Sequence, residues 1–564
     1  MKFSDYKYER LNIDEIKKKL EVATSNVKNA KSANDAIKEV LNVNEIKKDT
    51  DTMASLCYVR YTINVFDEFY EAEQEFIDET SPVVEEYFNN FNKALVASPF
   101  INELENRFGK KFFEEIRLDL KTFSPDIIPL LQEENKLSSA YSKLIASAKI
   151  NFDGKELNIR QVSAYFNKKD RGIRREAEEA IGSFLEENED KFDDIYDKLV
   201  KVRCEMARIL GFDSYVELGY ARLGRMDYDS KMVKGYRDEI YSSLVPLVSK
   251  MYEAQRVRLG LDTLMSYDLA YEFASGNPTP QGETKELVEK ANKMYHEMSK
   301  ETGEFFDFMV ERELMDLESK KGKDSGGYCT YFPNYDSPFI FSNFNGTSDD
   351  IDVLTHEAGH AFQAYCSKDV ELLENMSPTL EACEIHSMSM EFFAWPWMNL
   401  FFPGQVEKRL YSHLSGTITF LPYGALVDHF QHEIYLNPLL SKDERKALWR
   451  KLEKKYCPWK VYGNKEYDKG TRWFLQGHIF ESPFYYIDYT LAQVCAQQFF
   501  IKNLENHEKA WQDYYALCKA GGSDTFLNLL KVANLKNPFE KGTIEFVTEK
   551  LNKYLETIDK EKLK

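Results

Sequence analysis

Two histidines in this chain are spaced so that they can share one metal ion. His356 and His360 are four residues apart, and Glu357 directly follows the first of them. On a helix this spacing puts both imidazoles on one face, so that both rings reach an ion at about 2.0 Å. The pattern predicts a metal site with an acidic side chain beside it.

The residues around this pair predict a helix that turns its polar face to the metal. Hydroxyl and carboxylate side chains at 347–350 are typical of a helix start. Asp352 lies one turn before His356 and is either an acceptor that orients this imidazole or a solvated side chain. The apolar residues form one stripe that excludes both histidines: Ile351, Leu354, Ala358, Ala361, Phe362 and Tyr365.

A catalytic zinc ion requires a third protein ligand and an open position for water. The segment 377–393 offers candidates, because Ser377 as N-cap and Pro378 as first residue predict a second helix there. Glu381, Glu384 and Glu391 share one face of this helix. Their spacing alone does not decide which of them is the ligand.

The remaining chain predicts a mostly α-helical protein with a small sheet. Residues 1–190 have apolar positions at helical spacing, interrupted by an Asp153-Gly154 turn that closes a hairpin. Helical spacing resumes beyond them, and Gly211 is the expected C-cap of one helix. Short aromatic runs between Gly326 and Gly346 predict strands directly before the metal helix, and their rings either pack in the core or line a cleft.

Composition excludes several classes of function. The 564 residues are 43% hydrophobic, and 74 Lys and Arg stand against 94 Asp and Glu, a net charge of −20. This sign disfavours nucleic acid and anionic membranes as partners. No apolar stretch approaches a membrane span, the first residues do not resemble a signal peptide, and the eight cysteines form no Cys-x-x-Cys pair. We therefore expect a cytoplasmic protein.

The sequence resembles the thimet-oligopeptidase-like zinc metallopeptidases, and among them the oligoendopeptidase F branch that includes the Pz-peptidases. The resemblance rests on residues 356–363 (His-Glu-Ala-Gly-His-Ala-Phe-Gln), 384–392 (Glu-Ile-His-Ser-Met-Ser-Met-Glu-Phe), 478–480 (His-Ile-Phe) and 483–489 (Pro-Phe-Tyr-Tyr-Ile-Asp-Tyr). It extends over most of the region 195–510, whereas the first 190 residues match only in being helical.

This resemblance implies a ligand set and a fold. The family's zinc ligands become His356, His360 and Glu384, for one zinc ion per chain, with Glu391 beside a ligand rather than on the metal. The implied fold is mostly α, with two helical lobes around a deep substrate channel and a small β-sheet beside the metal helix. The expected boundaries are 1–190 for the N-terminal lobe and 191–564 for the catalytic lobe.

The resemblance also implies hydrolysis of internal peptide bonds in extended oligopeptides. Zinc supplies Lewis acidity to a water molecule, and Glu357 takes the proton of this water as general base. The family uses a histidine and tyrosines near the C-terminus as donors to the oxyanion, which are His478, Tyr486 and Tyr489 here. Ser482 replaces a tyrosine of the thimet branch, and which tyrosine contacts the oxyanion stays open. The substrate is expected to add as a strand to an exposed sheet edge.

Several alternatives are weaker. A peptidase that releases carboxy-terminal dipeptides needs a fixed cation, for which Arg472 is the candidate. An inactive peptide-binding protein would have lost Glu357 or a ligand, and none is lost. The remaining candidate groups are thiol nucleophiles at Cys366 and Cys383, a substrate or ligand contact at His386, and a metal-binding pair at His429 and His432, which is more typical of a solvated helix face.

Overall fold

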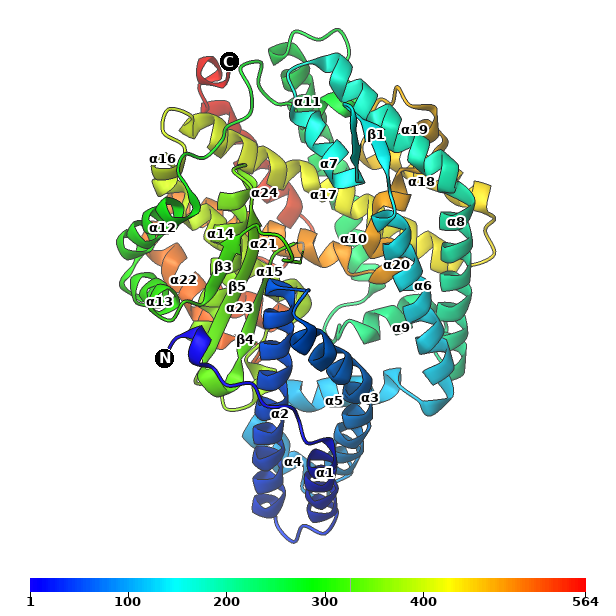
Figure 1. Ribbon diagram of the computed structural model, residues 1–564, viewed down its shortest axis with the longest axis vertical. Helices are drawn as coiled ribbons and strands as arrows, with labels where there is room; N and C mark the ends of the chain where they lie inside the picture. Colours follow the sequence, from blue (N-terminus) through cyan, green and yellow to red (C-terminus); the bar gives the residue numbers. More distant parts are fainter. Residues whose placement is uncertain (325) are drawn as a thin grey trace. The chain divides into compact units, whose positions relative to one another are not determined.

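The computed structural model describes residues 1–324 and 326–564, and most of them are helical (Figure 1). The chain divides into two compact units. Unit 1 consists of Met1–Leu120, Thr279–Gly404 and Cys495–Leu535, and unit 2 of Lys121–Pro278, Gln405–Val494 and Lys536–Lys564. The boundary that we predicted at residue 190 falls inside helix α8 (Arg171–Leu210). The division into 1–190 and 191–564, and the channel between two lobes, stay predictions.

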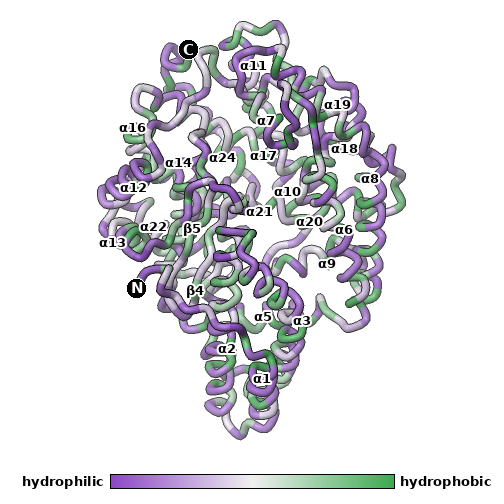
Figure 2. The backbone as a smooth tube through the Cα atoms, in the orientation of Figure 1, coloured by the Kyte–Doolittle hydropathy of each residue, from purple (hydrophilic) through white to green (hydrophobic). Residues whose placement is uncertain are grey.

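Unit 1 begins with a bundle whose helices bury one apolar stripe each. Side chains of Asn12, Ser32 and Asp67 cap the first three helices by accepting from backbone N–H groups. The stripes from these helices and the next two form one hydrophobic cluster, and Figure 2 shows the alternation of polar and apolar residues along them. The helices of the bundle are α1 (Ile13–Lys28), α2 (Ala33–Ile63), α3 (Glu68–Val96), α4 (Ile101–Phe108) and α5 (Lys110–Thr122).

A three-stranded sheet in unit 1 lies beside the helix that carries the paired histidines. β5 (Ser337–Phe344) is central, with β3 (Met315–Glu318) parallel to it and β4 (Tyr328–Phe332) antiparallel. Helix α14 (Asp349–Cys366) packs on β5 and β4 (Figure 1). The predicted small sheet beside the metal helix is therefore confirmed.

The remaining elements of unit 1 surround α14. Helix α15 (Leu380–Phe393) packs against α14 along its length, and α22 also contacts it. The other helices are α12 (Thr284–Met298), α13 (Lys300–Glu311), α16 (Met398–Phe401), α22 (His507–Ala520) and α23 (Phe526–Val532), together with the second half of α21 (Tyr486–Glu505).

Unit 2 is built on two long helices, α8 and α17 (Val406–Leu436). Its small hairpin pairs β1 (Ile150–Phe152) with β2 (Lys155–Leu157) across the predicted Asp153-Gly154 turn, and Gly211 ends α8 with a left-handed φ of 79°. Both local predictions are confirmed. The other helices are α6 (Ile128–Ala146), α7 (Ile159–Ser163), α9 (Tyr215–Arg222), α10 (Ser230–Glu239), α11 (Val245–Arg258), α18 (Lys442–Tyr456), α19 (Lys465–Lys469), α20 (Gly477–Glu481) and α24 (Thr543–Thr557).

The start of α15 differs from the sequence prediction. The helix begins at Leu380 with Thr379 as N-cap, and not with Ser377 as N-cap and Pro378 as first residue. Gly522 donates its N–H to the Asn375 carbonyl, and a Cβ at Gly522 would lie 1.9 Å from the Ser377 carbonyl oxygen. This backbone contact holds the stretch before Thr379 in a non-helical path, so that packing overrides the local signal.

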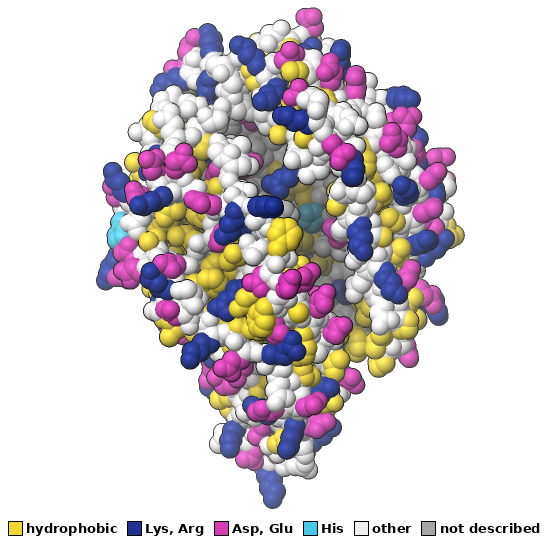
Figure 3. Space-filling view, viewed as in Figure 1, with side chains coloured by type: hydrophobic (Ala, Val, Ile, Leu, Met, Phe, Trp, Pro, Cys, Tyr) yellow, Lys and Arg dark blue, Asp and Glu magenta, His cyan; other side chains and the backbone are white. Residues whose placement is uncertain are grey.

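Acidic and basic side chains are interspersed on the face of the molecule in Figure 3. Among the residues that the structure describes, no helix combines the length and the apolar character that crossing a membrane requires.

Gly359 sets how closely α14 and α15 approach. A Cβ at this position would lie 2.6 Å from the Ser387 Cα and 2.7 Å from the His386 carbonyl oxygen. We expect Gly359→Ala to destabilise the protein by about 1–3 kcal/mol, because the two backbones must move apart. Differential scanning calorimetry should show this as a lower melting temperature.

Gly416→Ala in α17 is the matched control. Gly416 is exposed, and apart from its chain neighbours and the backbone of its own helix no atom of the described residues lies within 4 Å of a Cβ placed there. Alanine at this position should leave stability unchanged or raise it by up to about 1 kcal/mol, since glycine is the weaker helix former. Equal melting temperatures for the two variants would contradict the close contact at Gly359.

Candidate metal centre and catalytic groups

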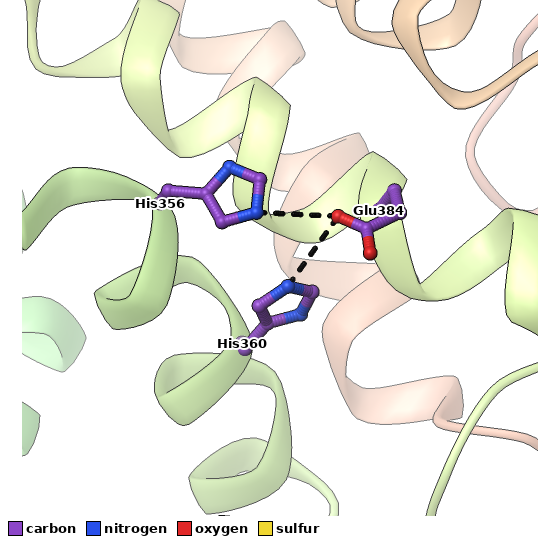
Figure 4. A group of neighbouring side chains, drawn as sticks. All are labelled: His356, His360 and Glu384. Carbon is purple, nitrogen blue, oxygen red and sulfur yellow. Dashed lines mark ion pairs between the residues drawn. The ribbon is translucent and has the colours of Figure 1, made fainter. Parts of the chain in front are cut away.

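Three donor atoms converge between α14 and α15. The Nε2 atoms of His356 and His360 lie 3.2 and 3.5 Å from the same oxygen, Oε2 of Glu384. The ligand atoms of the three residues all lie within 4.8 Å of one another. Figure 4 shows the imidazoles extending from one helix toward the carboxylate on the other.

A second carboxylate fixes the orientation of His356. Its Nδ1–H donates to Oε1 of Glu391 at 2.7 Å, which leaves the Nε2 lone pair for a metal. Glu391 is thus the acceptor that orients this ring. One of the two alternatives that we considered for Asp352 was this role. Glu391 follows Glu384 by two helical turns of α15, so one helix supplies both carboxylates.

Burial and charge act against each other at this site. Burial acts to lower the pKa of His356, but hydrogen bonds with Glu384 and Glu391 outweigh it and hold this pKa well above its ordinary value. For Glu384 burial acts to raise the pKa, and the two imidazoles outweigh it and hold this pKa well below its usual range. The site thus favours positive charge next to an ionised Glu384.

Glu357 lies on α14 between the two histidines and is 8% exposed. Burial raises the pKa of this carboxyl, while the nearby imidazoles of His356 and His360 act in the opposite direction. A carboxylate with a raised pKa is a stronger base, which is what proton abstraction from water requires.

The donor set fits a catalytic zinc ion. Two imidazole nitrogens and one carboxylate oxygen are a ligand combination of catalytic zinc sites, which keep a fourth position for water. The Nδ1 of His356 is engaged by a carboxylate, as is usual for histidines that bind zinc. His356, His360 and Glu384 are therefore the residues that would hold the ion.

A second group of candidate residues forms an aromatic cluster in unit 2. The ring of His478 in α20 lies 4.9 Å from that of Tyr486 and 5.8 Å from that of Tyr489, measured between centroids. The ring centroids of Tyr485 and Tyr489 are 4.9 Å apart. The structure thus brings His478, Tyr486 and Tyr489 together within unit 2. It likewise brings the predicted residues of α14 and α15 together within unit 1: His356, Glu357, His360 and Glu384.

Gln476 contacts the imidazole of this cluster. Its Nε2 donates to Nδ1 of His478 at 2.9 Å, while its Oε1 accepts from the hydroxyl of Tyr423 at 2.8 Å. Burial lowers the pKa of His478, which favours the neutral ring. A neutral ring that accepts at Nδ1 carries its proton at Nε2. No motif in the sequence pointed to Gln476.

His386 lies two residues after Glu384 on α15. It is fully buried, and the hydroxyl of Tyr514 donates to its backbone carbonyl at 2.9 Å. Burial lowers the pKa of its ring to about 4. The ring is thus a neutral, buried side chain, and the contact with substrate or with a metal ligand that we considered for it stays a prediction.

The thiols considered as nucleophiles are not activated. Burial raises the pKa of Cys383 to about 12 and that of Cys366 still further, so neither forms a thiolate near neutral pH. A thiol mechanism therefore has no support at these positions.

The other candidate groups make separate contacts. His429 Nδ1 lies 2.9 Å from the Tyr456 hydroxyl, whereas His432 Nε2 lies 3.0 Å from the Tyr220 hydroxyl. The guanidinium of Arg472 lies 5.8 Å from the centroid of the Tyr467 ring. These contacts give no support to a metal-binding histidine pair or to a carboxylate receptor at Arg472.

Comparisons with known proteins agree with this geometry. The peptidase M3 N-terminal domain matches residues 3–123, and the profile of peptidase family M3 matches residues 164–547. The structure of Pz peptidase A with an inhibitor is 51% identical and has a TM-score of 0.93, with 99% of this chain and 100% of that chain covered.

Curated relatives are more distant. Oligoendopeptidase F (plasmid) of Lactococcus lactis subsp. cremoris is 23% identical over 440 residues, which cover 72% of this chain and 70% of that protein. Group B oligopeptidase PepB of Streptococcus agalactiae serotype III (strain NEM316) is 24% identical over 394 residues, 65% of this chain and 60% of that protein. The predicted family, the predicted mostly α fold and the prediction of a metallopeptidase are confirmed. Because the family profile covers well over half of its residues, the chain belongs to peptidase family M3.

Proposed function

We propose that this protein is a zinc-dependent endopeptidase that cleaves internal bonds of oligopeptides in the cytoplasm. The observation that carries the proposal is the convergence of His356, His360 and Glu384 in a chain of peptidase family M3. Relatives that are named oligoendopeptidase F and oligopeptidase support internal cleavage and short substrates.

Each residue of the centre has a distinct task. His356, His360 and Glu384 would hold one zinc ion, and Glu391 keeps the His356 ring in the required orientation. The ion, when bound, supplies Lewis acidity that lowers the pKa of water. Glu357 accepts the proton of the attacking water and afterwards delivers it to the leaving amine.

Donors from the aromatic cluster would stabilise the oxyanion that forms at the attacked carbonyl. The hydrogen bond from Gln476 to Nδ1 of His478 supports this role, because it leaves Nε2–H as the donor. Tyr489 and Tyr486 are phenolic donors one helical turn apart at the start of α21. A neutral imidazole and a phenol donate hydrogen bonds near neutral pH without carrying charge into the ground state.

The edge of the sheet offers a backbone surface for an extended peptide. β4 pairs with β5 on one side only within its sheet, whose strand order is β3-β5-β4, and its residues Tyr328 to Tyr331 are partly exposed. A peptide that adds along this strand would be bound by main-chain hydrogen bonds, which tolerate many side chains. Broad sequence tolerance follows from this mode of binding.

The first prediction concerns the metal. Glu384→Ala removes one of three donors, so zinc content should fall from about one ion per chain to well below it, and activity should be lost with it. Inductively coupled plasma mass spectrometry after dialysis measures the content. Glu381→Ala, in the same helix, is the control and should retain zinc. Full zinc occupancy in Glu384→Ala would mean that another carboxylate is the ligand.

The second prediction concerns the base and the type of cleavage. Digestion of peptides of graded length should give internal fragments by mass spectrometry. Glu357→Gln should keep zinc but lower turnover by roughly 10²- to 10⁴-fold, because an amide cannot accept the proton of water. Near-normal turnover in this variant would exclude Glu357 as the base, and products shortened only by carboxy-terminal dipeptides would exclude endopeptidase activity.

The third prediction concerns the oxyanion. Tyr489→Phe removes one hydroxyl, and we expect kcat to fall by about 10²- to 10³-fold with KM nearly unchanged, because the hydrogen bond exists only in the transition state. Steady-state kinetics on one internally quenched peptide measures both constants. Tyr486→Phe is the comparison: a larger loss of kcat in that variant would exchange the two roles, and a raised KM at constant kcat in both would make them substrate contacts.

A further inference from the structure

A strained residue lies inside the segment that carries the proposed oxyanion donors. Phe484 has a φ of 69°, in the left-handed region that bulky residues rarely adopt. It follows α20, which holds His478, and directly precedes the residues that lead into α21 with Tyr486 and Tyr489. Such strain persists only where the surroundings hold it, and it is concentrated at functional sites.

Buried side chains bind both backbone groups of Phe484. Its N–H donates to Oε1 of Gln431 at 3.0 Å, and its carbonyl accepts from Nη2 of Arg225 at 2.6 Å. Gln431 is itself oriented by donating to the Val427 carbonyl within α17. The peptide groups on either side of the strained Cα are therefore both fixed.

The ring of Phe484 is held as well. It is fully buried, with centroids 4.9 Å from His432 and 5.5 Å from Tyr435. Gly219 of α9 also contacts it, because a Cβ at Gly219 would be 2.7 Å from the Phe484 ring. The surroundings thus determine both the backbone and the ring of this residue.

Arg225 makes a second contact from the same Nη2 atom. It donates to Oδ1 of Asp488 at 2.6 Å, and both side chains of this ion pair are fully buried. Asp488 lies in the first turn of α21, between Tyr486 and Tyr489. The guanidinium of Arg225 therefore hydrogen-bonds both to the strained residue Phe484 and to α21, the helix that carries Tyr486 and Tyr489.

We propose that Arg225 is a positioning residue that fixes the direction in which α21 presents Tyr489, by holding Phe484 in its left-handed conformation and Asp488 in its place. The inference rests on the proposed role of Tyr489 at the oxyanion. Lysine is not equivalent to Arg225 here: its ammonium has enough N–H groups for two acceptors, but this nitrogen ends one bond nearer the backbone than Nη2 of arginine, so we expect it not to reach both Phe484 and Asp488.

The ion pair alone does not prove such a role, since unit 2 contains a comparable pair elsewhere. Arg174 donates to Asp268 at 2.8 Å, and both of these side chains are at most 3% exposed, although Asp268 also accepts from Arg171. This pair connects the start of α8 with the short 3-10 helix Ser266–Asp268 and belongs to neither α20 nor α21. Arg174→Lys therefore reports the effect of disturbing a buried Arg–Asp pair as such.

The test is a double-mutant cycle of Arg225→Lys with Tyr489→Phe, measured as kcat and KM, with zinc content and melting temperature for each protein. We expect Arg225→Lys alone to lower kcat by about 10- to 100-fold with little change in KM, because the phenol is displaced while substrate binding is not. In the Tyr489→Phe background the same change should lower kcat by less than about 3-fold, since the hydroxyl that it positions is gone. Arg174→Lys should leave kcat unchanged below its melting temperature.

Asp488→Asn is the second variant, for use if Arg225→Lys does not fold. It keeps the shape of the side chain, removes the charge, and should show the same non-additivity with Tyr489→Phe. Equal losses of kcat in both backgrounds, or no loss in either Arg225→Lys or Asp488→Asn, would overturn the positioning role. If Tyr489→Phe and Tyr486→Phe both left kcat unchanged, the oxyanion role itself would fail and the positioning role with it. If Tyr489→Phe lowered kcat but the losses of kcat from Arg225→Lys and Tyr489→Phe were additive, only the role of Arg225 would be overturned.

Discussion

Contact between the backbones of α14 and α15 at Gly359 is the constraint on which the candidate metal centre depends. The space for a Cβ at this residue is taken by the Ser387 Cα and the His386 carbonyl oxygen, at 2.6 and 2.7 Å. A glutamate reaches only a short distance beyond its backbone, so Glu384 meets both imidazoles only because the helices touch. In a helix interior glycine costs about 1 kcal/mol relative to alanine. Packing at the centre, and not helix propensity, explains the glycine of the His-Glu-Ala-Gly-His run.

Charge is the second constraint on this centre. Three buried or half-buried carboxylates, Glu357, Glu384 and Glu391, surround two imidazoles, and desolvation makes their negative charge costly unless a cation is nearby. Burial alone would lower the pKa of His356, yet Glu384 and Glu391 raise it well above its ordinary value. A proton and a metal ion therefore compete for the same Nε2 lone pair, and metal affinity falls as pH decreases. The carboxylates around His356 thus favour a bound metal ion and a bound proton for the same electrostatic reason.

Local and periodic signals in the sequence predicted most of the fold. The helix of His356 and His360, the Asp153-Gly154 hairpin and the small sheet before α14 depend on neighbouring residues, and the sequence contains that information. The start of α15 was predicted wrongly because Gly522, 145 positions after Ser377, holds the preceding stretch. For the candidate site, spacing placed Glu381, Glu384 and Glu391 on one face but did not choose among them, since the choice depends on how α15 packs on α14. Gln476 and Arg225 carry no motif, and their contacts appear only in three dimensions.

Two unfavourable features occur together at the start of α21. A bulky residue in the left-handed region costs about 1–3 kcal/mol, and a buried ion pair often contributes no more stability than well-packed apolar side chains would. At Phe484 and Arg225 each feature reduces the cost of the other, because the strained carbonyl gives the guanidinium a second buried acceptor beside Asp488. Glycine at 484 with an apolar pair at 225 and 488 would avoid both costs but would leave the turn free to relax. Stability alone therefore does not account for this combination, whereas a fixed direction for the phenols of α21 does.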